Sequence, residues 1–492
     1  MAKLKMLAID LGASSGRGIV GTFDGKKLTL EENHRFSNDP VMVAGTFTWD
    51  TLRIFHEIKN SIRKCALSED KDIASIGIDT WGVDFGLIDK AGKLMANPVH
   101  YRDTRTVGII EYADKFVPRE ELYNTTGLQF QNFNTVYQIL ASLRDNPVYI
   151  NNADKLLFTP DLFNYLLTGV KKCEYTIAST GAILDAKKRE YAYDMLGKFG
   201  IPTDIFAPIA QPGSIVGPLL PEILEEVGDI RANVVNVAAH DTGSAVVAVP
   251  AVNDDFIFLS SGTWSIMGAE VKEPIISEKS FKYNFTNEGG AENTIRFEKN
   301  ITGLWLKQES KRQWEREGKK YTHDELSDMA LASKPFQSLI DPDDAAFGVP
   351  GNLPKRIAEY CKRTNQHVPE NAGEVMRCIF ESLALRYRYT VEKIDEVKGH
   401  RTPFINIIGG GTKEALLCQF TADACGRPAY AGPVEATAIG NIACQAIAAG
   451  ELKNVAEARE VVRNSFDIEC YEPQNSEAWD EAYERFKTLI EK

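Results

Sequence analysis

The chain has 492 residues and a formal net charge of −13; 43% of its residues are hydrophobic and 25% are charged. This length exceeds one hydrophobic core, so we expect at least two globular domains. The acidic balance argues against a nucleic-acid or anionic-membrane surface, although single loops can still bind an anionic substrate. We predict a cytoplasmic protein, because no apolar run reaches membrane-spanning length, no signal peptide is recognisable and the eight cysteines form no C-x-x-C pair.

The first half opens with a predicted hairpin. An apolar strand from Lys5 to Leu11 leads into a loop rich in serine and glycine, and a second strand returns at Ile19–Phe23. The pattern G-x-x-x-x-G-K-[ST] does not occur anywhere in the chain, so this loop is not of the Walker type. Further elements are predicted as a strand from residue 28, a helix at 50–65 and strands at 73–79, 85–88 and 93–95. Residues 106–230 are predicted to be mostly helical.

The segment from Asn233 to Pro250 predicts a ligand site. The β-branched run Val234–Ala239 indicates a buried strand, a polar turn follows at 240–243, and small apolar residues from Ser244 indicate a helix. Such a turn lies at the carboxyl edge of a sheet, where open α/β sheets bind ligands. Asp241 is therefore a candidate functional carboxylate, and the alternative is that it only caps the helix.

The second half repeats this order. A strand at 256–259, a Ser/Gly loop at 260–263 and a returning strand at 264–269 echo the opening, and a strand at 404–408 leads through three glycines into a helix at 413–425. Further strands are predicted at 281–285 and 293–297, and helices at 303–313, 375–397 and 433–449. We therefore predict a duplicated α/β fold, with domains at 1–250 and 251–492 facing each other across a cleft.

Several of these motifs suit phosphate transfer, and each has a plainer alternative. Two Gly/Ser loops can cradle a phosphate chain with backbone N–H groups, but each alone can be an ordinary hairpin turn. Asp10 offers a hard oxygen ligand for Mg²⁺, or it bonds its own turn. The glycines at 409–411 suit a flat group such as adenine, or a helix entry. The stretch 79–84 offers carboxylates and Trp81 to a polyol, and the alternative for Trp81 is core packing.

Motifs spread over nearly the whole chain resemble the FGGY family of carbohydrate kinases. They are DLGASSGR (10–17), SIGIDTWGVDF (75–85), YRDTRT (101–106), NTVYQ (134–138), HDT (240–242), LSSGTWS (259–265), NEGGAE (287–292) and GPVEA (432–436). The resemblance implies two ribonuclease-H-like domains of the actin/hexokinase/Hsp70 type, the first binding sugar and the second binding nucleotide.

Within the family, the motifs are most similar to those of kinases that act on L-rhamnulose. The resemblance implies transfer of phosphate from ATP, with Mg²⁺, to the C1 hydroxyl of this ketose in L-rhamnose catabolism. It implies that Asp241 is the catalytic base and Asp10 the magnesium ligand. The implied sugar contacts are Gly82, His240, Asp241, Thr242 and Asn300. The implied nucleotide contacts are Ala13, Ser14, Ser15, Gly16, Arg17, Thr263, Gln308 and Gly410.

One departure and two alternatives accompany the resemblance. After the glycines the family commonly has a polar pair such as Gln-Asn, whereas this chain has Lys413 and Glu414. A related ketose kinase, acting on L-fuculose or xylulose, would share most of the motifs. A nucleotide-driven interaction protein would share the domain type, because actin and Hsp70 have it. The sequence leaves the oligomeric state open.

Overall fold

The computed structural model describes residues 3–68, 72–474 and 476–491. Contacts between Cα atoms divide the chain into two compact units. The first unit comprises Met1–Val252, Glu270–Phe297 and Ala436–Ser465, and the second comprises Asn253–Ala269, Glu298–Glu435 and Phe466–Lys492. The chain crosses from one unit to the other within strands β16 and β18. The assignment of sugar binding to 1–250 and nucleotide binding to 251–492 stays a prediction.

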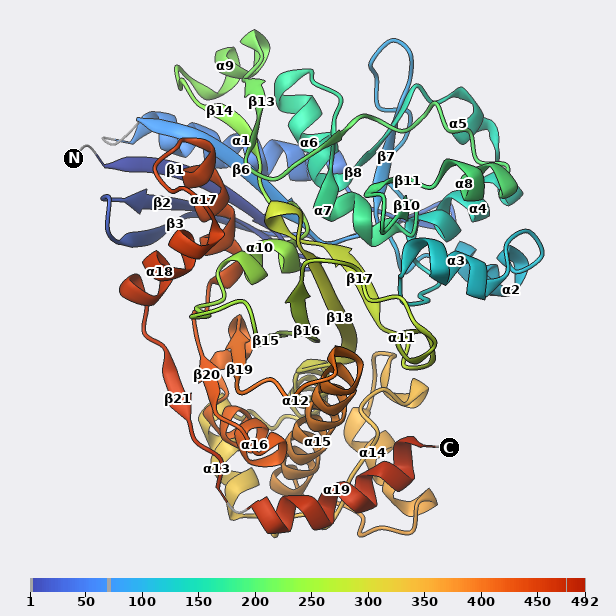
Figure 1. The fold of residues 1–492 in the computed structure, drawn as a ribbon, viewed down its shortest axis with the longest axis vertical. Helices are drawn as coiled ribbons and strands as arrows, with labels where there is room; N and C mark the ends of the chain where they lie inside the picture. Colours follow the sequence, from blue (N-terminus) through green and yellow to red (C-terminus); the bar gives the residue numbers. More distant parts are fainter. Residues whose placement is uncertain (1–2, 69–71, 475, 492) are drawn as a thin grey trace. The chain divides into compact units, whose positions relative to one another are not determined.

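The first unit is built on a six-stranded sheet (Figure 1). Its order is β13 (Ser214–Pro218), β14 (Asn233–Asn236), β6 (Ile73–Thr80), β1 (Leu4–Leu11), β2 (Ser15–Phe23) and β3 (Leu28–Ser37). β1, β2 and β3 form an antiparallel meander, whereas β1, β6 and β14 are parallel. β1 is buried from Met6 to Leu11, as expected for a central strand covered on both faces.

Two helices illustrate why the sequence folds as it does here. α1 (Thr51–Leu67) buries Ile54, Ile58 and Ile62, which recur every four residues on one face, and the side chain of Asp50 accepts the N–H of Arg53 at 3.2 Å to cap it. α17 (Ala436–Ala448) comes from late in the chain and packs against α10 (Asp241–Val247) and β1. Small residues allow this close approach.

Residues 106–230, predicted to be mostly helical, are less helical than predicted. β7 (Phe85–Ile88) pairs with β8 (Lys155–Phe158), and only Leu94 of the predicted strand at 93–95 forms a bridge, to Ile88. The helices are α2 (Ile109–Ala113), α3 (Arg119–Thr126), α4 (Thr135–Asp145), α5 (Val148–Asn152), α6 (Thr159–Thr168), α7 (Tyr175–Ala178), α8 (Tyr193–Lys198) and α9 (Pro221–Val227). The short strands are β4 (Val41–Val43), β5 (Thr46–Thr48), β9 (Cys173–Glu174), β10 (Leu184–Asp185), β11 (Glu190–Tyr191) and β12 (Ile209–Ala210).

The strand predicted at 281–285 is wrong. Residues Glu278–Lys282 form helix α11, and β17 (Thr286–Gly289) begins only afterwards. The side chains of Ser277 and Ser280 each bond the other's backbone N–H in a capping box, which starts the helix despite the aromatic residues that follow. The local cap therefore outweighs β propensity.

The second unit repeats the strand pattern of the first. β15 (Ile257–Ser261) is antiparallel to β16 (Trp264–Val271) and parallel to β19 (Ile405–Ile408), which is parallel to β20 (Ala429–Ala431) and is followed by β21 (Glu469–Tyr471) at the edge. This matches the first unit, in which β1 is antiparallel to β2 and parallel to β6, and β6 is parallel to β14. The predicted duplication of strand–loop–strand openings is confirmed.

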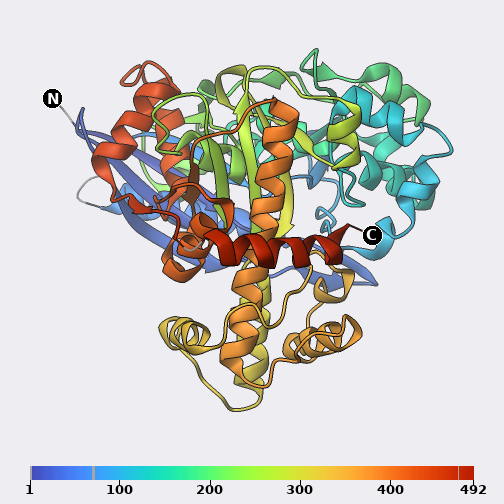
Figure 2. The ribbon, with the colours of Figure 1, turned by 60° about the horizontal axis from the view of Figure 1, so that its bottom comes forward.

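Helix α15 (Ala372–Lys398) is the long central helix of the second unit. It contacts α12 (Trp305–Arg316), α13 (His323–Ala332), α16 (Ala415–Cys425) and α19 (Ser476–Ile490), and Figure 2 shows α19 crossing it. The predicted helices at 303–313, 375–397, 413–425 and 433–449 are confirmed to within a few residues. The remaining elements are α14 (Leu353–Arg363), α18 (Val455–Ser465) and β18 (Ile295–Thr302).

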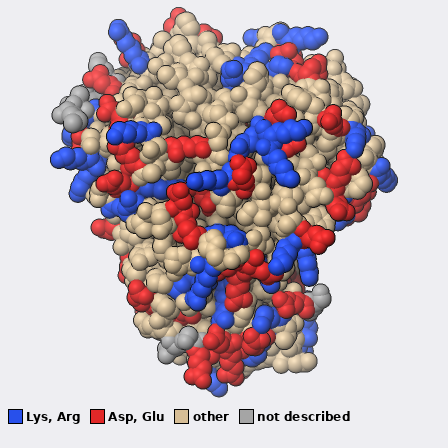
Figure 3. Space-filling view, in the orientation of Figure 1, with Lys and Arg blue, Asp and Glu red and all other residues tan. Residues whose placement is uncertain are grey.

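Lysine and arginine side chains alternate with acidic ones over the face drawn in Figure 3, so the charges of this face do not segregate by sign.

All eight cysteines are free, and only Cys470 among them is exposed. Within residues 3–68, 72–474 and 476–491, no helix has the length and apolar character needed to cross a bilayer.

The packing of α17 on α10 gives a stability prediction. A Cβ added at Gly440 would lie 1.7 Å from the backbone oxygen of Ser244, which cannot move without shifting α10. We expect Gly440→Ala to lower the free energy of unfolding by about 2 kcal/mol or more, measured by thermal denaturation. Gly197→Ala in α8 is the matched control: its Cβ meets no atom within 4 Å, so stability should hold or rise slightly. Equal melting temperatures for the two variants would contradict this packing.

Candidate active site

Three neighbouring segments of the first unit end at one edge of its sheet. Asp10 at the end of β1 pairs with Asp79 at the end of β6, and Thr80 forms a parallel bridge with His240. The backbone N–H of Thr80 donates to the carbonyl of Ala239 at 2.8 Å, which holds the turn after β14 against β6. The chain thus gathers several of its predicted site residues at a carboxyl edge, where α/β sheets bind ligands.

Asp241 is the first residue of α10, and His240 occupies the N-cap position. Oδ1 of Asp241 accepts the backbone N–H of Thr242 at 2.6 Å and lies 3.4 Å from Nε2 of His240. Its side chain is 34% exposed. Asp241 bonds a first-turn N–H of α10 whereas His240 makes no side-chain cap bond, so both the capping role and the functional role of Asp241 stay predictions. A carboxylate beside a helix N-terminus, held by one oxygen and open to solvent, can accept a proton.

A second carboxylate lies behind this edge. Asp79 is fully buried; burial, and next the nearby Asp10 carboxylate, raise its pKa well above the usual range, with a smaller effect of Asp241. Nδ2 of Asn441 donates to its Oδ2 at 2.6 Å. Arg17 pairs with Asp10 through a contact of 2.5 Å, placing a positive charge in the acidic group. The charge of Asp10, and to a smaller extent that of Asp241, therefore acts on the buried carboxyl of Asp79.

Amides of α17 hold the two strands that carry these acids. Gln445 donates to the carbonyl of Leu7 at 3.1 Å and to Oδ1 of Asn441 at 2.7 Å, and it accepts from Ser75 at 2.7 Å. Neither amide was predicted from the sequence as part of the site. The sequence does contain a signal for them, because the two amides are four residues apart in a segment of otherwise small and apolar residues. Buried polar side chains in such a helix nearly always have hydrogen-bond partners.

His240 is fixed by a buried ion pair. Its Nδ1 lies 3.0 Å from Nη2 of Arg296 and 3.1 Å from Oε2 of Glu288, and these two side chains contact each other at 3.0 Å. Arg296 is fully buried and also donates to the carbonyl of Gly289 at 2.9 Å. Because one ring nitrogen is engaged in this way, Nε2 is directed toward Asp241. Glu288 lay within a motif used above, whereas Arg296 was missed.

An aromatic cluster lies beside Gly82. Oδ2 of Asp84 accepts from the indole N–H groups of Trp49 at 2.6 Å and Trp81 at 3.0 Å, and the two rings lie 4.1 Å apart. Gln138 donates to the other oxygen at 2.9 Å. The expectation that Asp84 offers its oxygens to a polyol is therefore wrong, because both are used internally. Burial raises the pKa of Asp84 to about 6, against the effect of these donors.

The first Ser/Gly loop is shorter than predicted. Ser15, Gly16 and Arg17 already belong to β2, so only residues 12–14 form the turn. The carbonyl of Ser15 accepts the N–H of Gly12 at 2.9 Å, and the side chain of Asn38 donates to the carbonyl of Gly12 at 2.9 Å. Ala13 and Ser14 are exposed. Strand pairing extends here because Gly16 and Arg17 continue the register opposite Leu11 and Asp10.

The predicted nucleotide residues of the second unit are also brought together. The loop carbonyls of Gly262 and Thr263 accept N–H groups of Leu304 and Trp305 at 2.9 and 3.0 Å, which joins the β15–β16 loop to α12. Oγ1 of Thr263 donates to Oε1 of Gln308 at 3.2 Å. Asn300 lies on β18, which precedes α12, and its role stays a prediction.

The glycines at 409–411 form a tight turn against the end of β15. Gly409 has φ 85°, and a Cβ on Gly411 would lie 2.0 Å from Oγ of Ser261. Both positions therefore require glycine for conformation or close packing. Gly410 is exposed and a Cβ there would meet no atom within 4 Å, so this residue presents bare backbone between two glycines that pack on Ser261.

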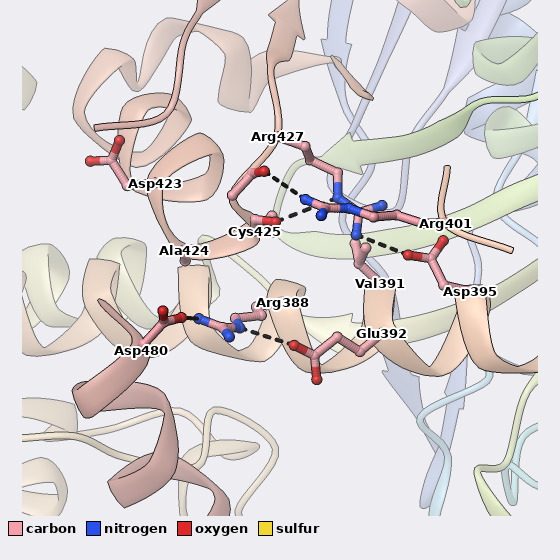
Figure 4. A pocket seen from close by; sticks show the side chains of 11 residues that line it. Arg388, Val391, Glu392, Asp395, Arg401, Asp423, Ala424, Cys425, Arg427 and Asp480 are labelled. Carbon is pink, nitrogen blue, oxygen red and sulfur yellow. Dashed lines mark hydrogen bonds and ion pairs between the residues drawn. The ribbon is translucent and has the colours of Figure 1, made fainter. Parts of the chain in front are cut away.

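A separate hollow of about 440 Å³ lies between α15, α16 and α19 of the second unit (Figure 4). Arg388 pairs with Glu392 and Asp480, and Arg427 pairs with Asp395. None of the predicted site residues lines this hollow. Two of its arginines are thus engaged in ion pairs within the protein, and the hollow is separate from the predicted site.

Models of two protein-family domains match successive parts of the chain. The model of the N-terminal domain of the FGGY family of carbohydrate kinases matches residues 5–248, and that of the C-terminal domain matches residues 257–449. The rhamnulokinase of Bacteroides thetaiotaomicron is 43% identical over 488 residues, covering 99% of this chain and all of the relative. The rhamnulokinase of Bacillus subtilis is 39% identical and covers 95% of each chain.

Solved structures with much lower identity share the fold. A ligand-bound xylulose kinase from Lactobacillus acidophilus superposes with a TM-score of 0.82 at 16% identity, covering 99% of this chain and 97% of that one. The glycerol kinase of Plasmodium falciparum with ADP gives 0.78 at 16% identity, with coverage of 99% and 97%. The two-domain carbohydrate-kinase fold expected from the motifs is confirmed. With both domain models matched and relatives near 40% identity over almost the whole length, the chain belongs to the FGGY family of carbohydrate kinases.

Proposed function

We infer that this chain transfers the γ-phosphate of ATP to the C1 hydroxyl of L-rhamnulose, giving L-rhamnulose 1-phosphate and ADP in L-rhamnose catabolism. The observation that carries this is the match to rhamnulokinases over nearly the full length of both chains, at 38–43% identity. Free and mostly buried thiols are typical of a reducing compartment, so we place the activity in the cytoplasm.

We assign the role of general base to Asp241. Its carboxylate takes the proton of the C1 hydroxyl as that oxygen bonds to the γ-phosphorus, while the bond from phosphorus to the bridging oxygen breaks and ADP leaves. Three features support the assignment: the place at the carboxyl edge, the open carboxylate, and the fixed imidazole of His240 at its side. We assign His240, Thr242, Gly82 and Asn300 to holding the sugar.

We assign the phosphates to the two hairpin loops. Ala13 and Ser14 offer exposed backbone, Ser15 and Gly16 continue into β2, and Arg17 adds positive charge. Thr263, Gln308 and Gly410 serve the nucleotide in the second unit. Support comes from the bond between Thr263 and Gln308 and from the open backbone of Gly410.

A magnesium ion fits Asp10. Mg²⁺ commonly binds proteins through one or two carboxylates and takes its other ligands from water and substrate phosphates. Asp10 and Asp79 lie opposite each other near the ends of adjacent strands, so two carboxylates are present at this edge. The ion would neutralise charge on the transferred phosphate; the chain's own contribution is to present the Asp10 carboxylate, with Arg17 nearby.

The substrate is tested with a panel of ketoses. We expect kcat/KM to be highest for L-rhamnulose and lower for L-fuculose and xylulose, because discrimination depends on differential transition-state contacts. ADP release measures the rate, and phosphorus NMR reads the position of the phosphate on the product. A higher kcat/KM for xylulose, or phosphate at a position other than C1, would refute the substrate.

The base is tested by Asp241→Asn. We expect a fall of about 10²–10⁴-fold in kcat, the usual worth of a positioned base, with an unchanged melting temperature. Asp89→Asn is the matched control, because Oδ1 of Asp89 also accepts backbone N–H groups of a turn but lies in a β7 hairpin away from this edge. Turnover of Asp241→Asn equal to that of the control would remove the role.

The aromatic cluster gives a pH prediction. The pKa of Asp84, raised by burial to about 6, means that this carboxyl is charged above pH 6 and protonated below it. Protonation weakens acceptance from the indoles of Trp49 and Trp81, so tryptophan emission should change with a midpoint near pH 6. His100, which also stacks on Trp49, has its pKa lowered by burial to about 4 and titrates outside this range.

Asp84→Asn should abolish that emission change. Trp264→Phe, which removes an exposed indole of the second unit, should retain it. Emission that stays flat between pH 5 and 7 in the wild type, or a midpoint that persists in Asp84→Asn, would contradict the assigned titration.

A further inference from the structure

We propose that Lys307 and Glu414 form a positioning pair that holds the nucleotide-binding turn against helix α12. This proposal deepens the proposed function and rests on the assignment of Gln308 and Gly410 to the nucleotide. Neither Lys307 nor Glu414 is among the residues assigned to it above.

The pair is short, bidentate and buried. Nζ of Lys307 lies 2.6 Å from Oε1 and 2.5 Å from Oε2 of Glu414, and the two residues are 1% and 7% exposed. His323 from α13 approaches Oε1 at 3.2 Å. Nζ also lies 5.6 Å from the centre of the Phe380 ring. Such geometry is that of a built ion pair and not of two surface side chains that happen to meet.

The pair joins two elements that both carry predicted nucleotide residues. Lys307 directly precedes Gln308 on α12, whose start is bonded to the Thr263 loop. Glu414 directly follows the turn Gly410–Lys413, and its N–H donates to the carbonyl of Gly411 at 3.0 Å. A fixed distance between Lys307 and Glu414 therefore fixes the distance between Gln308 and the exposed backbone of Gly410.

The carboxylate acts through the turn rather than on the nucleotide itself. Both of its oxygens are taken by Lys307, and one is shared with His323. Burial lowers the pKa of Lys307, while Glu414 opposes this shift and favours the ammonium form. Buried ion pairs are weak evidence for stability, since apolar residues of similar size often replace them without loss, and their better-attested use is to fix register.

The test compares nucleotide and sugar parameters in the full-length enzyme. We expect Lys307→Met and Glu414→Gln each to raise KM for ATP, and Kd for ADP measured by calorimetry, by tenfold or more, while KM for the ketose changes less than twofold. Lys307→Arg keeps the positive charge but replaces the compact ammonium group with a larger planar guanidinium, so it should recover only part of the nucleotide affinity. Lys311→Met is the matched control on the same helix, because Lys311 only approaches Glu315 at 4.0 Å on the surface.

Glu414→Asp keeps the charge and shortens the side chain by one methylene, so it tests the pair even where a charge-removing variant does not fold. It should raise KM for ATP with little change in melting temperature. Unchanged nucleotide KM and Kd in Glu414→Asp and in the folded variants, with only a lower melting temperature, would overturn the proposal.

Failure of the underlying nucleotide assignment gives a different result. If Gln308 does not contact the nucleotide, Gln308→Ala would leave the affinity for ADP unchanged. If Gln308→Ala weakens ADP binding whereas the Lys307 and Glu414 variants do not, the site stands and the positioning pair is refuted.

Discussion

Parallel pairing of β1, β6 and the segment after β14 is the constraint on which the rest of the first unit depends. It brings Asp10, Asp79 and His240 to one edge, although they are separated by 69 to 230 residues in the sequence. The edge also places Asp241 at the first turn of α10, where backbone N–H groups favour a carboxylate. A helix that began one turn later would remove that carboxylate from the edge.

Bringing several carboxylates together is unfavourable because like charges repel and burial removes their hydration, and neighbouring polar groups partly offset both effects. Asp79 is buried beside Asp10, and its raised pKa reflects both burial and repulsion. Arg17 on the paired strand and the amide of Asn441 compensate part of this charge. The second unit uses a related device at the glycine turn, where Lys307 accompanies Glu414 into the interior. In each unit a buried polar side chain bonds a carboxylate near the segment assigned to a ligand: Asn441 bonds Asp79 in the first unit, and Lys307 bonds Glu414 in the second.

Much of this organisation could be predicted from sequence, because the strands are apolar runs that end in Gly, Ser or Asp. The hairpin at 5–23, its repeat at 257–271 and the helix after Asp241 follow from such local signals. What could not be predicted depends on distant partners. Arg296 and Glu288 hold His240 from another segment, Asn441 reaches Asp79 across 362 residues, and Asp84 turns inward onto Trp49. The helix at 278–282 was missed because a serine capping box outweighed an aromatic, strand-like composition.

We propose that Asp241, at this carboxyl edge, receives the proton of the sugar hydroxyl. A crystal structure of the enzyme with L-rhamnulose and a non-hydrolysable ATP analogue would show whether it does. We expect a carboxylate oxygen of Asp241 within about 2.6–3.2 Å of the C1 hydroxyl oxygen, with Nε2 of His240 beside the sugar. A C1 hydroxyl bound instead by another carboxylate, or a sugar that does not contact α10, would contradict it.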